Sequence, residues 1–404
     1  MSISTLLEVE RCPARWALSR GEYPDVWRRQ GYPRAIQWPT LEGTVVHRSV
    51  QRVVSALAER GCRSLSDEST VDALRELGGY TAVVGAATTQ VLREYEDSPR
   101  ARSAMNAVRQ QLGFRVPSMR LSVQRLVART HLVPRVPARR GPAGSSEPAS
   151  RKRLREGVYS EVGLRSAELG WRGVADLITI DKDTCEIRDF KTGSPSAGHG
   201  LQLRVYALLW FRDRVRNPDE RLASRLIVSY GGEDREIPSP SRGELKELEA
   251  TLRERTTEAM ASLAEEPPGA RPSQENCTYC PVRQLCEDYW AWNSKNVADT
   301  DEVGGDFVDL QIRLTGRNGP GSWDGTIESG RDLESGDRVL LRGTNWPFAL
   351  KLGQRLRVLN VRRGSGGEER FAQAEGGRTV VATMVGGSEV FLVPGLSQWD
   401  VNAL

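Results

Sequence analysis

The stretch "GVADLITIDKDTCEIRDFKTG", residues 173–193, contains two apolar strand patterns joined by the short turn "DKD". Alternate side chains of a strand share a face, so Asp189 and Lys191 project together while Phe190 points away into packing. Asp176 lies on the preceding strand and is expected close to them. This stretch therefore predicts two carboxylates and a lysine gathered at one point of a β-sheet.

Two carboxylates that converge repel each other, and their pKa values rise unless a cation is bound between them. Hard oxygen ligands of this kind suit Mg²⁺ or Mn²⁺. A lysine beside such a metal can orient a water and stabilise the negative charge that grows on a phosphate under attack. The chain has only six lysines, and a second acid-x-Lys match, Glu244 to Lys246, falls in a charged helical pattern. The strand context, and not the tripeptide, carries the prediction.

The flanking sequence completes an α/β domain that we expect to end near residue 298. Apolar spacing predicts a helix over 41–60 that contains His47, and a later helix in which Gln202 and Tyr206, four residues apart, share a face. Taken alone, a single helical His is more often a packing or capping residue, and a Gln and Tyr pair is usually surface chemistry. The remaining predicted elements are strands at 158–164 and 225–232, helices over 200–215 and about 241–264, and further helical stretches up to about 131.

The order of four motifs, "GTVVH", "GVADL", "RDFKTG" and "QLRVY", resembles the PD-(D/E)xK nuclease superfamily in its RecB-like branch. The resemblance implies a restriction-endonuclease-like core, a mixed sheet flanked by helices, with Mg²⁺- or Mn²⁺-dependent phosphodiester hydrolysis. Carried over residue by residue, it implies His47 as an additional metal ligand, Asp176 and Asp189 as metal-binding acids, Lys191 as the catalytic lysine, and Gln202 and Tyr206 as residues that position the lysine and the DNA.

Three cysteines, Cys277, Cys280 and Cys286, occur in "CTYCPVRQLC". A tetrahedral zinc site needs a fourth thiolate, and the second nearby C-x2-C pair of a zinc ribbon is missing, which leaves Cys12 as the candidate. One cysteine before the nuclease motifs and three after them resembles the iron-sulfur nucleases of the same superfamily, AddB-type subunits and CRISPR-associated RecB-like exonucleases. The resemblance implies a structural [4Fe-4S] cluster that ties the ends of the domain together, with zinc in the same four thiolates as the alternative.

Two further regions have distinct compositions. Residues at about 132–157 are rich in Pro, Gly, Ser and Arg, which favours a basic flexible insertion over a dedicated phosphate-contacting arm. Residues 299–404 form a Gly-rich tail in which we expect a small β-barrel-like domain, an oligonucleotide-binding (OB) barrel being one option. In it, Trp323, Trp346 and Phe348 are either surfaces for stacking bases or, as we favour, barrel core. The strands expected in the tail are 307–315, 337–343, 355–362, 378–384 and 389–393.

The net charge of +4 and pI of 8.8 permit a nucleic-acid partner without requiring one. The N-terminus lacks the apolar region of a secretory signal, and no apolar run approaches the roughly 18 residues of a membrane span, so we expect a cytoplasmic protein without a membrane partner. No lysine follows a glycine, which excludes a Walker A loop. Any unwinding must therefore come from a separate helicase or ATPase.

Together these features predict a metal-dependent DNA nuclease that acts on single-stranded DNA or DNA ends. Repair, recombination and antiviral defence remain open as its pathway. The rival hypothesis is a nuclease-like scaffold that binds DNA or a partner without cutting. The acids and the lysine are all present, which favours the enzyme.

Overall fold

The computed structural model describes residues 1–102, 104–135, 151–295, 307–343, 346, 348–364 and 379–393. These residues form two compact units. The sheet unit comprises Met1–Leu7 and Pro33–Ala261, and the barrel unit comprises Glu8–Tyr32 and Ser262–Leu404. The boundary expected at residue 298 therefore falls inside the barrel unit. Residues 136–150, the centre of the expected basic insertion, lie outside the described residues.

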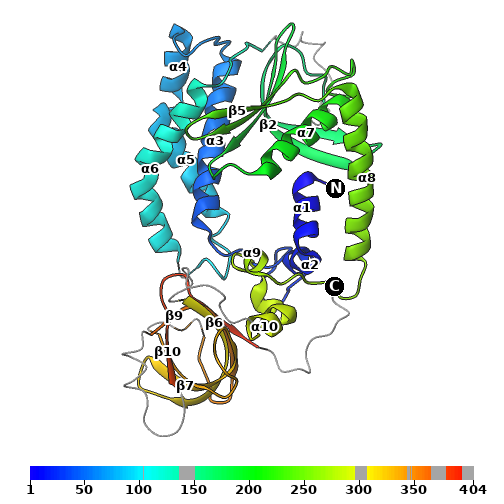
Figure 1. Cartoon of the computed structure of the whole chain (residues 1–404). Helices are drawn as coiled ribbons and strands as arrows, with labels where there is room; N and C mark the ends of the chain where they lie inside the picture. The colour runs from blue at the N-terminus through cyan, green and yellow to red at the C-terminus, as the bar shows by residue number, and fades with distance from the viewer. Residues whose placement is uncertain are drawn as a thin grey trace. The chain divides into compact units, whose positions relative to one another are not determined.

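A five-stranded mixed sheet with the order β1-β2-β3-β4-β5 is the centre of the sheet unit (Figure 1). All neighbouring pairs are antiparallel except β3 and β4, which are parallel and need a crossover that α7 supplies. The strands are β1 Gly157–Ser166, β2 Trp171–Ile180, β3 Cys185–Lys191, β4 Arg225–Tyr230 and β5 Asp234–Ile237. The first four were predicted. The fifth, "DREI", was missed because its side chains are mostly charged and exposed, which leaves no apolar alternation to detect.

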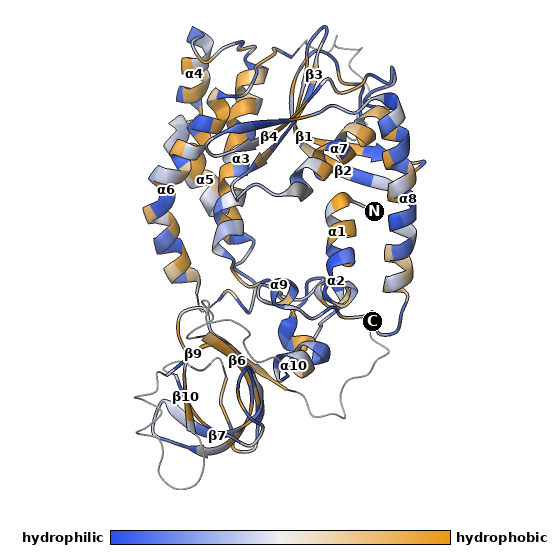
Figure 2. Ribbon diagram, viewed as in Figure 1, coloured by the Kyte–Doolittle hydropathy of each residue, from blue (hydrophilic) through white to orange (hydrophobic). Residues whose placement is uncertain are grey.

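Helices cover both faces of this sheet (Figure 1). Helix α3 contacts β1, and α7 contacts β1 to β4. The helices that lie wholly or partly in this unit are α1 Ile3–Arg11, α3 Trp38–Glu59, α4 Glu68–Glu76, α5 Gly79–Arg93, α6 Met105–Ala128, α7 Ala197–Arg212 and α8 Arg242–Leu263. The apolar stripe of α3 is buried in one core with α5, α6, Val158 and Leu177, and Figure 2 shows apolar stretches along α3 and α5. On α7, Ser196 caps the N-terminus by accepting a hydrogen bond from the Gly198 amide.

Gly173 of β2 sets how closely α7 approaches the sheet. A Cβ atom at this position would lie 2.9 Å from a ring carbon of Tyr206 and 3.0 Å from a methyl group of Leu209. A larger residue would push α7 outward, so the glycine in "GVADL" has a packing role beside the carboxylate that follows it.

The barrel unit contains a closed five-stranded barrel. Its strands pair in the cycle β6-β7-β8-β10-β9-β6, with β8 and β10 parallel, and β11 extends the sheet beside β9. The bounds are β6 Phe307–Arg317, β7 Ser322–Gly330, β8 Arg338–Arg342, β9 Arg355–Arg363, β10 Thr379–Thr383 and β11 Glu389–Leu392. The predicted barrel and its five expected strands are confirmed, whereas β7, "SWDGTIESG", was missed because glycine and polar residues interrupt it.

Three barrel aromatics pack against the barrel core. Trp323, Trp346 and Phe348 are partly buried and pack against the cluster that contains Leu310, Ile312 and other strand residues. This packing agrees with the core interpretation of these side chains. Four short helices complete the described part of this unit: α2 Pro13–Arg20, α9 Gln274–Cys277, the 3₁₀ turn Arg283–Leu285 and α10 Glu287–Asn293. In the described residues, no helix has both the length and the apolar character required to cross a membrane.

Candidate active site

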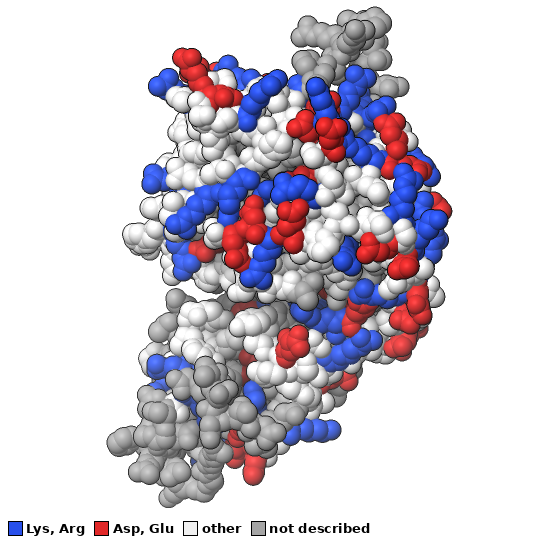
Figure 3. All heavy atoms as spheres, turned by 45° about the horizontal axis from the view of Figure 1, so that its top comes forward, with Lys and Arg blue, Asp and Glu red and all other residues white. Residues whose placement is uncertain are grey.

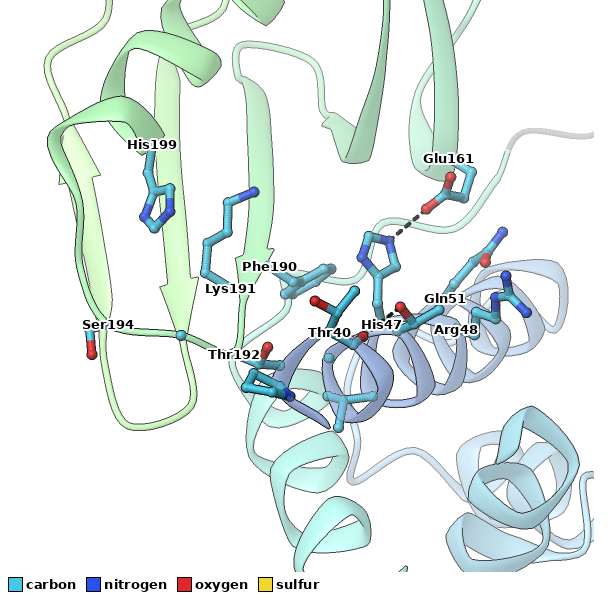
Figure 4. Close-up of a pocket in the computed structure, with 15 residues that line it drawn as sticks. Thr40, His47, Arg48, Gln51, Glu161, Phe190, Lys191, Thr192, Ser194 and His199 are labelled. Carbon is cyan, nitrogen blue, oxygen red and sulfur yellow. Dashed lines mark hydrogen bonds and ion pairs between the residues drawn. The ribbon is translucent and has the colours of Figure 1, made fainter. Parts of the chain in front are cut away.

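Helix α3 approaches the end of β3 through Gly43. A Cβ atom on Gly43 would lie 2.7 Å from the hydroxyl oxygen of Thr192, so a larger residue would displace the Thr192 side chain. One turn later on the same helix, His47 directs its Nε2 atom at Glu161 of β1, 2.6 Å from Oε1 (Figure 4). The same nitrogen lies 3.6 Å from Oδ1 of Asp176 on β2. The motif "GTVVH" thus combines a close-packing glycine with a side chain that reaches the carboxylates.

His47, Glu161 and Asp176 form a candidate metal site. Their ligand atoms all lie within 4.8 Å of one another. Opposite ligands of a Mg²⁺ ion are about 4 Å apart, because each Mg–O bond is about 2.1 Å. Adjacent ligands at this bond length are about 3 Å apart, so the 2.6 Å contact between Nε2 of His47 and Oε1 of Glu161 must open slightly for both atoms to bind one divalent cation. The donor set of one imidazole and two carboxylates suits such an ion.

Glu161 was missed by the sequence reasoning. It lies in "VYSEVGL" on β1, and the flanking pairs Ser160↔Leu177 and Val162↔Ala175 place it opposite Asp176. Its backbone has φ +52°, which is uncommon for a residue other than glycine and is often a feature of functional positions. Pairing the predicted strand at 158–164 with the strand of Asp176 as an antiparallel hairpin would have identified Glu161 as the residue opposite Asp176.

Asp189 and Lys191 lie beside this group on β3. The register Leu177↔Arg188 brings the next position, Asp189, alongside Asp176. The Nζ atom of Lys191 lies 2.7 Å from Oδ2 of Asp189, whose side chain is 1% exposed, whereas that of Lys191 is 23% exposed. The Phe190 amide donates a hydrogen bond of 2.7 Å to Oδ2 of Asp176. The strand therefore fixes both acids and leaves the lysine free to face the pocket.

The protonation of these groups fits a site built for a cation. Burial, and then the charge of Asp189, raise the pKa of Asp176 to about 7. Burial lowers the pKa of His47, but its hydrogen bond to Glu161 and the nearby negative charges outweigh this, so its pKa is raised. Oδ2 of Asp189 is buried and, among the described residues, accepts no well-aligned hydrogen bond. A divalent cation would relieve the repulsion that raises the Asp176 pKa.

A pocket of about 480 Å³ opens in front of this group (Figure 4). Its lining includes His47, Glu161, Lys191 and two polar side chains that the sequence reasoning did not assign, Thr40 and His199. In Figure 4, the Lys191 side chain lies between His199 and the His47–Glu161 pair. The pocket thus has metal-ligand candidates on one wall and an ammonium group on another.

The chain matches the family model of the PD-(D/E)XK nuclease superfamily over residues 1–287. It belongs to this superfamily. The nucleases of this superfamily use divalent metals, and the cluster of histidine and carboxylates provides a site for one.

Two solved structures are similar to this superfamily member over part of its length. The crystal structure of SSO0001 is 22% identical and covers 32% of this chain, with a TM-score of 0.22, and the match spans 60% of the SSO0001 chain. The structure of a murine DNA-binding protein bound to double-stranded DNA is 6% identical in sequence, with a TM-score of 0.17. That match covers 59% of this chain and 96% of the murine chain. At these TM-scores neither likeness bears on function. No curated protein matches the chain.

The Gln and Tyr of this PD-(D/E)XK chain lie on α7, as expected. The side-chain amide of Gln202 donates a hydrogen bond of 2.7 Å to the hydroxyl of Tyr206. Burial raises the pKa of Tyr206, and the charges of Asp189, Asp176 and Glu161 raise it further, against the opposing effect of that hydrogen bond. Tyr206 is therefore a neutral phenol that lies close to the carboxylates. It lines a neighbouring hollow, whereas Gln202 and Asp189 line neither this hollow nor the main pocket.

The four cysteines meet in the barrel unit of the same nuclease-superfamily chain. Cys12, Cys277, Cys280 and Cys286 line one cavity of about 20 Å³, here called the cysteine cavity, and all four are free thiols. Burial raises the pKa of Cys286 to about 12, and it also raises the pKa values of Cys277 and Cys280. A metal would reverse this effect, because thiolates are the metal-binding form.

A buried polar network connects the cysteine segment to the barrel within this unit. Arg283, which follows Cys280, donates a hydrogen bond of 2.6 Å to Asp309 on β6 and one of 2.9 Å to Asn360 on β9. The Tyr289 hydroxyl donates to the same Asp309 carboxylate at 2.7 Å. A barrel residue also donates to the cysteine segment: the Arg357 guanidinium of β9 donates to both carboxylate oxygens of Glu287 at 2.7 Å. The cysteine cavity and the barrel are thus one structural unit.

Proposed function

We propose that this protein is a Mg²⁺- or Mn²⁺-dependent deoxyribonuclease of the RecB-like branch that acts on single-stranded DNA or DNA ends. The observation that carries the proposal is the meeting of His47, Glu161 and Asp176 within 4.8 Å, beside the pair of Asp189 and Lys191. Superfamily membership implies metal-dependent nuclease chemistry, and these side chains fit it in donor type and spacing.

His47, Glu161, Asp176 and Asp189 are the side chains that would hold the metal. When bound, the metal supplies an activated water and a positive charge for the leaving oxygen. Asp189 holds the Lys191 ammonium at 2.7 Å, at the wall of the pocket. That ammonium offers a fixed positive charge to the phosphate as negative charge develops on it. Arginine suits this position less well, because its charge is delocalised and its group is bulkier.

Tyr206 and Gln202 would position the DNA. The amide of Gln202 donates to the phenol, which leaves the Tyr206 O–H free to donate to a phosphate oxygen. The lysine, the phenol and the metal ligands come from β3, α7, β1, β2 and α3, so that five elements must pack correctly before the site exists. This dependence agrees with sites built on rigid secondary structure.

We propose further that the four cysteines hold a metal centre that is structural. A zinc ion bound by four thiolates keeps the sulfurs about 3.8 Å apart, since each Zn–S bond is about 2.3 Å. In the described chain, no three cysteine sulfurs lie within 4.8 Å of one another. This wider separation favours a [4Fe-4S] cluster, in which each cysteine binds a different iron. The small volume of the cysteine cavity favours zinc, which is the second candidate.

The barrel supports a role in DNA binding. Its cyclic strand order with one parallel pair, β8 and β10, matches that of an OB barrel, a fold that binds oligonucleotides. Because its aromatic side chains are partly buried against the barrel core, we expect other side chains of the barrel to contact the DNA. We propose a cytoplasmic enzyme that works in repair, recombination or antiviral defence, with unwinding supplied by a separate helicase or ATPase.

The test is direct cleavage by the purified full-length chain. It is incubated with end-labelled single-stranded DNA, double-stranded DNA and RNA, in Mg²⁺, in Mn²⁺ and in chelator. We expect single-stranded DNA to be degraded with either metal and to survive in chelator. The matched control is Asp176→Ala, which removes one ligand and should be inactive. A wild-type chain that binds DNA but cuts no substrate would favour the non-cleaving scaffold.

A further inference from the structure

Two arginines face each other on the β1–β2 hairpin without an acid between them. Arg165 of β1 and Arg172 of β2 are direct partners in the strand register, and both are exposed. Side chains in this relation are about 5 Å apart at Cβ, and like charges placed so are destabilising. Among the described residues, neither guanidinium has an ion pair with a carboxylate. An anion bound between the two side chains would stabilise such a pair.

The surroundings of this pair add positive charge. The N-terminal ammonium of Met1 donates a hydrogen bond of 2.9 Å to the carbonyl of Gly170, in the turn of the same hairpin. The Arg172 amide donates a hydrogen bond of 2.9 Å to the Met1 carbonyl, and burial and then the charge of Arg172 lower the pKa of this ammonium. Asp213 accepts a hydrogen bond of 2.9 Å from the backbone amide of Arg165, and it already pairs with the Arg151 guanidinium. Glu168, in the turn of the same hairpin, lies 3.9 Å from the Arg253 guanidinium, so neither of these two acids pairs with the guanidinium of Arg165 or Arg172.

Two hollows meet at the arginine pair. The first, of about 350 Å³, extends from Arg165 and Arg172 past Val174 to Tyr206. The second, of about 450 Å³, extends from the same pair to Arg151 and other arginines near the end of α7. Both hollows are lined by the arginine pair, and together they are here called the arginine track, which begins at Tyr206. The Tyr206 ring packs against Gly173, three residues before Asp176 on β2, so the track starts near the candidate metal ligands.

We propose that Arg165 and Arg172 bind the backbone phosphates of a single DNA strand where it extends beyond the catalytic carboxylates. This inference rests on the proposed nuclease function and adds the path of its substrate. Guanidinium groups bind phosphate oxygens in bidentate geometry, and a phosphate between the two would remove their repulsion. Because the pair is so closely spaced, it suits one phosphate or two successive phosphates of the same strand.

The position of the pair sets a length requirement. Arg172 precedes Asp176 by four residues on β2, which is about 13 Å along a strand. Phosphates of one strand are about 3.4 Å apart along a duplex and up to about twice that when extended. The contact therefore lies about two to four nucleotides from the scissile phosphate. The exposed side chain of Val174, between the two positions, offers an apolar contact to a sugar or base.

The distribution of charge over the surface does not by itself mark a path for DNA, so the inference rests on the local arrangement of the arginine pair. On the face drawn in Figure 3, Lys and Arg side chains are interspersed with Asp and Glu and do not form one continuous basic patch. Other arginines of the sheet unit pair with acids, as the Arg212 side chain does with Glu249 at 2.6 Å. Arg165 and Arg172 differ because their partner in the sheet is another cation.

The experiment compares two charge-matched double variants of the full-length chain. The test variant carries Arg165→Gln and Arg172→Gln, and the control carries Arg120→Gln and Arg125→Gln, two exposed arginines of α6 that line none of these hollows. Binding of labelled single-stranded oligonucleotides of about 4 and about 16 nucleotides is followed by fluorescence anisotropy over a salt series, with Ca²⁺ replacing the catalytic metal.

For the test variant we expect weaker binding of the long oligonucleotide, by about tenfold or more, with a smaller loss for the short one. The slope of log affinity against log salt should fall by about 0.7 for each phosphate contact removed, thus by about 1.4 for two. The melting temperature without DNA should stay the same or rise, since a like-charge pair is removed. A purely structural role for the pair would lower it instead.

Several results would overturn the inference. One is a salt slope and affinity equal to those of the α6 control. Another is a larger effect on a blunt duplex than on the single strand, which would assign the pair to double-stranded DNA. Failure of the nuclease function is distinguishable, because it appears as a wild-type chain that cuts nothing, whereas failure of the arginine track leaves cleavage intact and the binding slopes identical.

Discussion

Lys191 offers the sharpest test of the catalytic arrangement. Its ammonium lies 2.7 Å from a carboxylate oxygen of Asp189 and lines the main pocket. Lys191→Ala removes one preorganised positive charge from the reacting phosphate. Losing one such stabilising group typically slows an enzyme by about 100- to 1000-fold, which is about 3–4 kcal/mol in the activation barrier. We expect a loss of this size in the cleavage rate.

The same change has a smaller, separable effect on folding. Asp189 is almost completely buried and loses its nearest cation, so its negative charge is left less compensated. Breaking a fully buried pair costs about 3–5 kcal/mol, and the partial exposure of Lys191 reduces that cost. A bound divalent metal replaces the lost charge. Lys191→Ala should therefore lower the melting temperature in chelator and lower it less in Mn²⁺.

The assay is a single-turnover cleavage rate on end-labelled single-stranded DNA, with affinity measured separately by anisotropy. DNA affinity should change little in Lys191→Ala, because the loss is in the transition state. Lys246→Ala is the matched control, since Lys246 is exposed on α8 in the chance acid-x-Lys match and should cut at the wild-type rate. Asp189→Ala should also be inactive, but through weaker metal binding. A Lys191→Ala variant that cuts at the full rate would refute the assigned role.

Four other outcomes follow from the structure. His47→Ala should reduce the preference for Mn²⁺ over Mg²⁺ in rate measurements, because it removes the one nitrogen donor; an unchanged metal preference would exclude His47 as a ligand. The pKa of Asp176 is raised to about 7, so metal affinity measured by calorimetry should fall up to about tenfold per pH unit below pH 7, because the protonated carboxyl does not bind the metal. The metal-free chain should lose stability as the pH rises from about 4 to 7. The reason is that the carboxyl of the unfolded chain ionises at lower pH than that of the folded chain. Cys12→Ala should abolish bound iron and sulfide, or zinc, after anaerobic purification while Cys62→Ala retains them; equal metal content in both would disprove the four-cysteine centre. Asp309→Ala leaves a buried guanidinium unpaired and should destabilise the barrel unit by about 3–5 kcal/mol, seen as faster hydrogen exchange in β6 and β9, and unchanged exchange would contradict this.

The sequence by itself determined the elements whose side chains alternate regularly. The strand around Asp176 is largely apolar, and in the strand around Asp189 the apolar Cys185 and Ile187 alternate with charged residues, so both strand patterns are visible without tertiary information. The helical spacing of Gln202 and Tyr206 predicted their contact for the same local reason. Strands whose residues are charged or interrupted by glycine, such as β5 and β7, gave no such signal.

Only the tertiary structure decided which distant residues meet. Glu161 joins His47 and Asp176 because the register of β1 against β2 places it there, and register depends on how the hairpin pairs rather than on any local preference. The approach of α3 to β3 depends on Gly43, whose contact with Thr192 spans almost 150 positions of sequence.

The division into units was decided in the same way. Composition placed a boundary near residue 298, where the strand-rich tail begins. In the structure, buried charges cross that point, as Arg283 pairs with Asp309 and the cysteine segment folds with the barrel. A buried ion pair requires its partner wherever it lies in the chain, because an uncompensated charge in the interior is costly. The composition of a segment indicates only its local solubility and flexibility. Ion pairs between distant segments, such as Arg283 with Asp309, depend on how the chain packs in three dimensions.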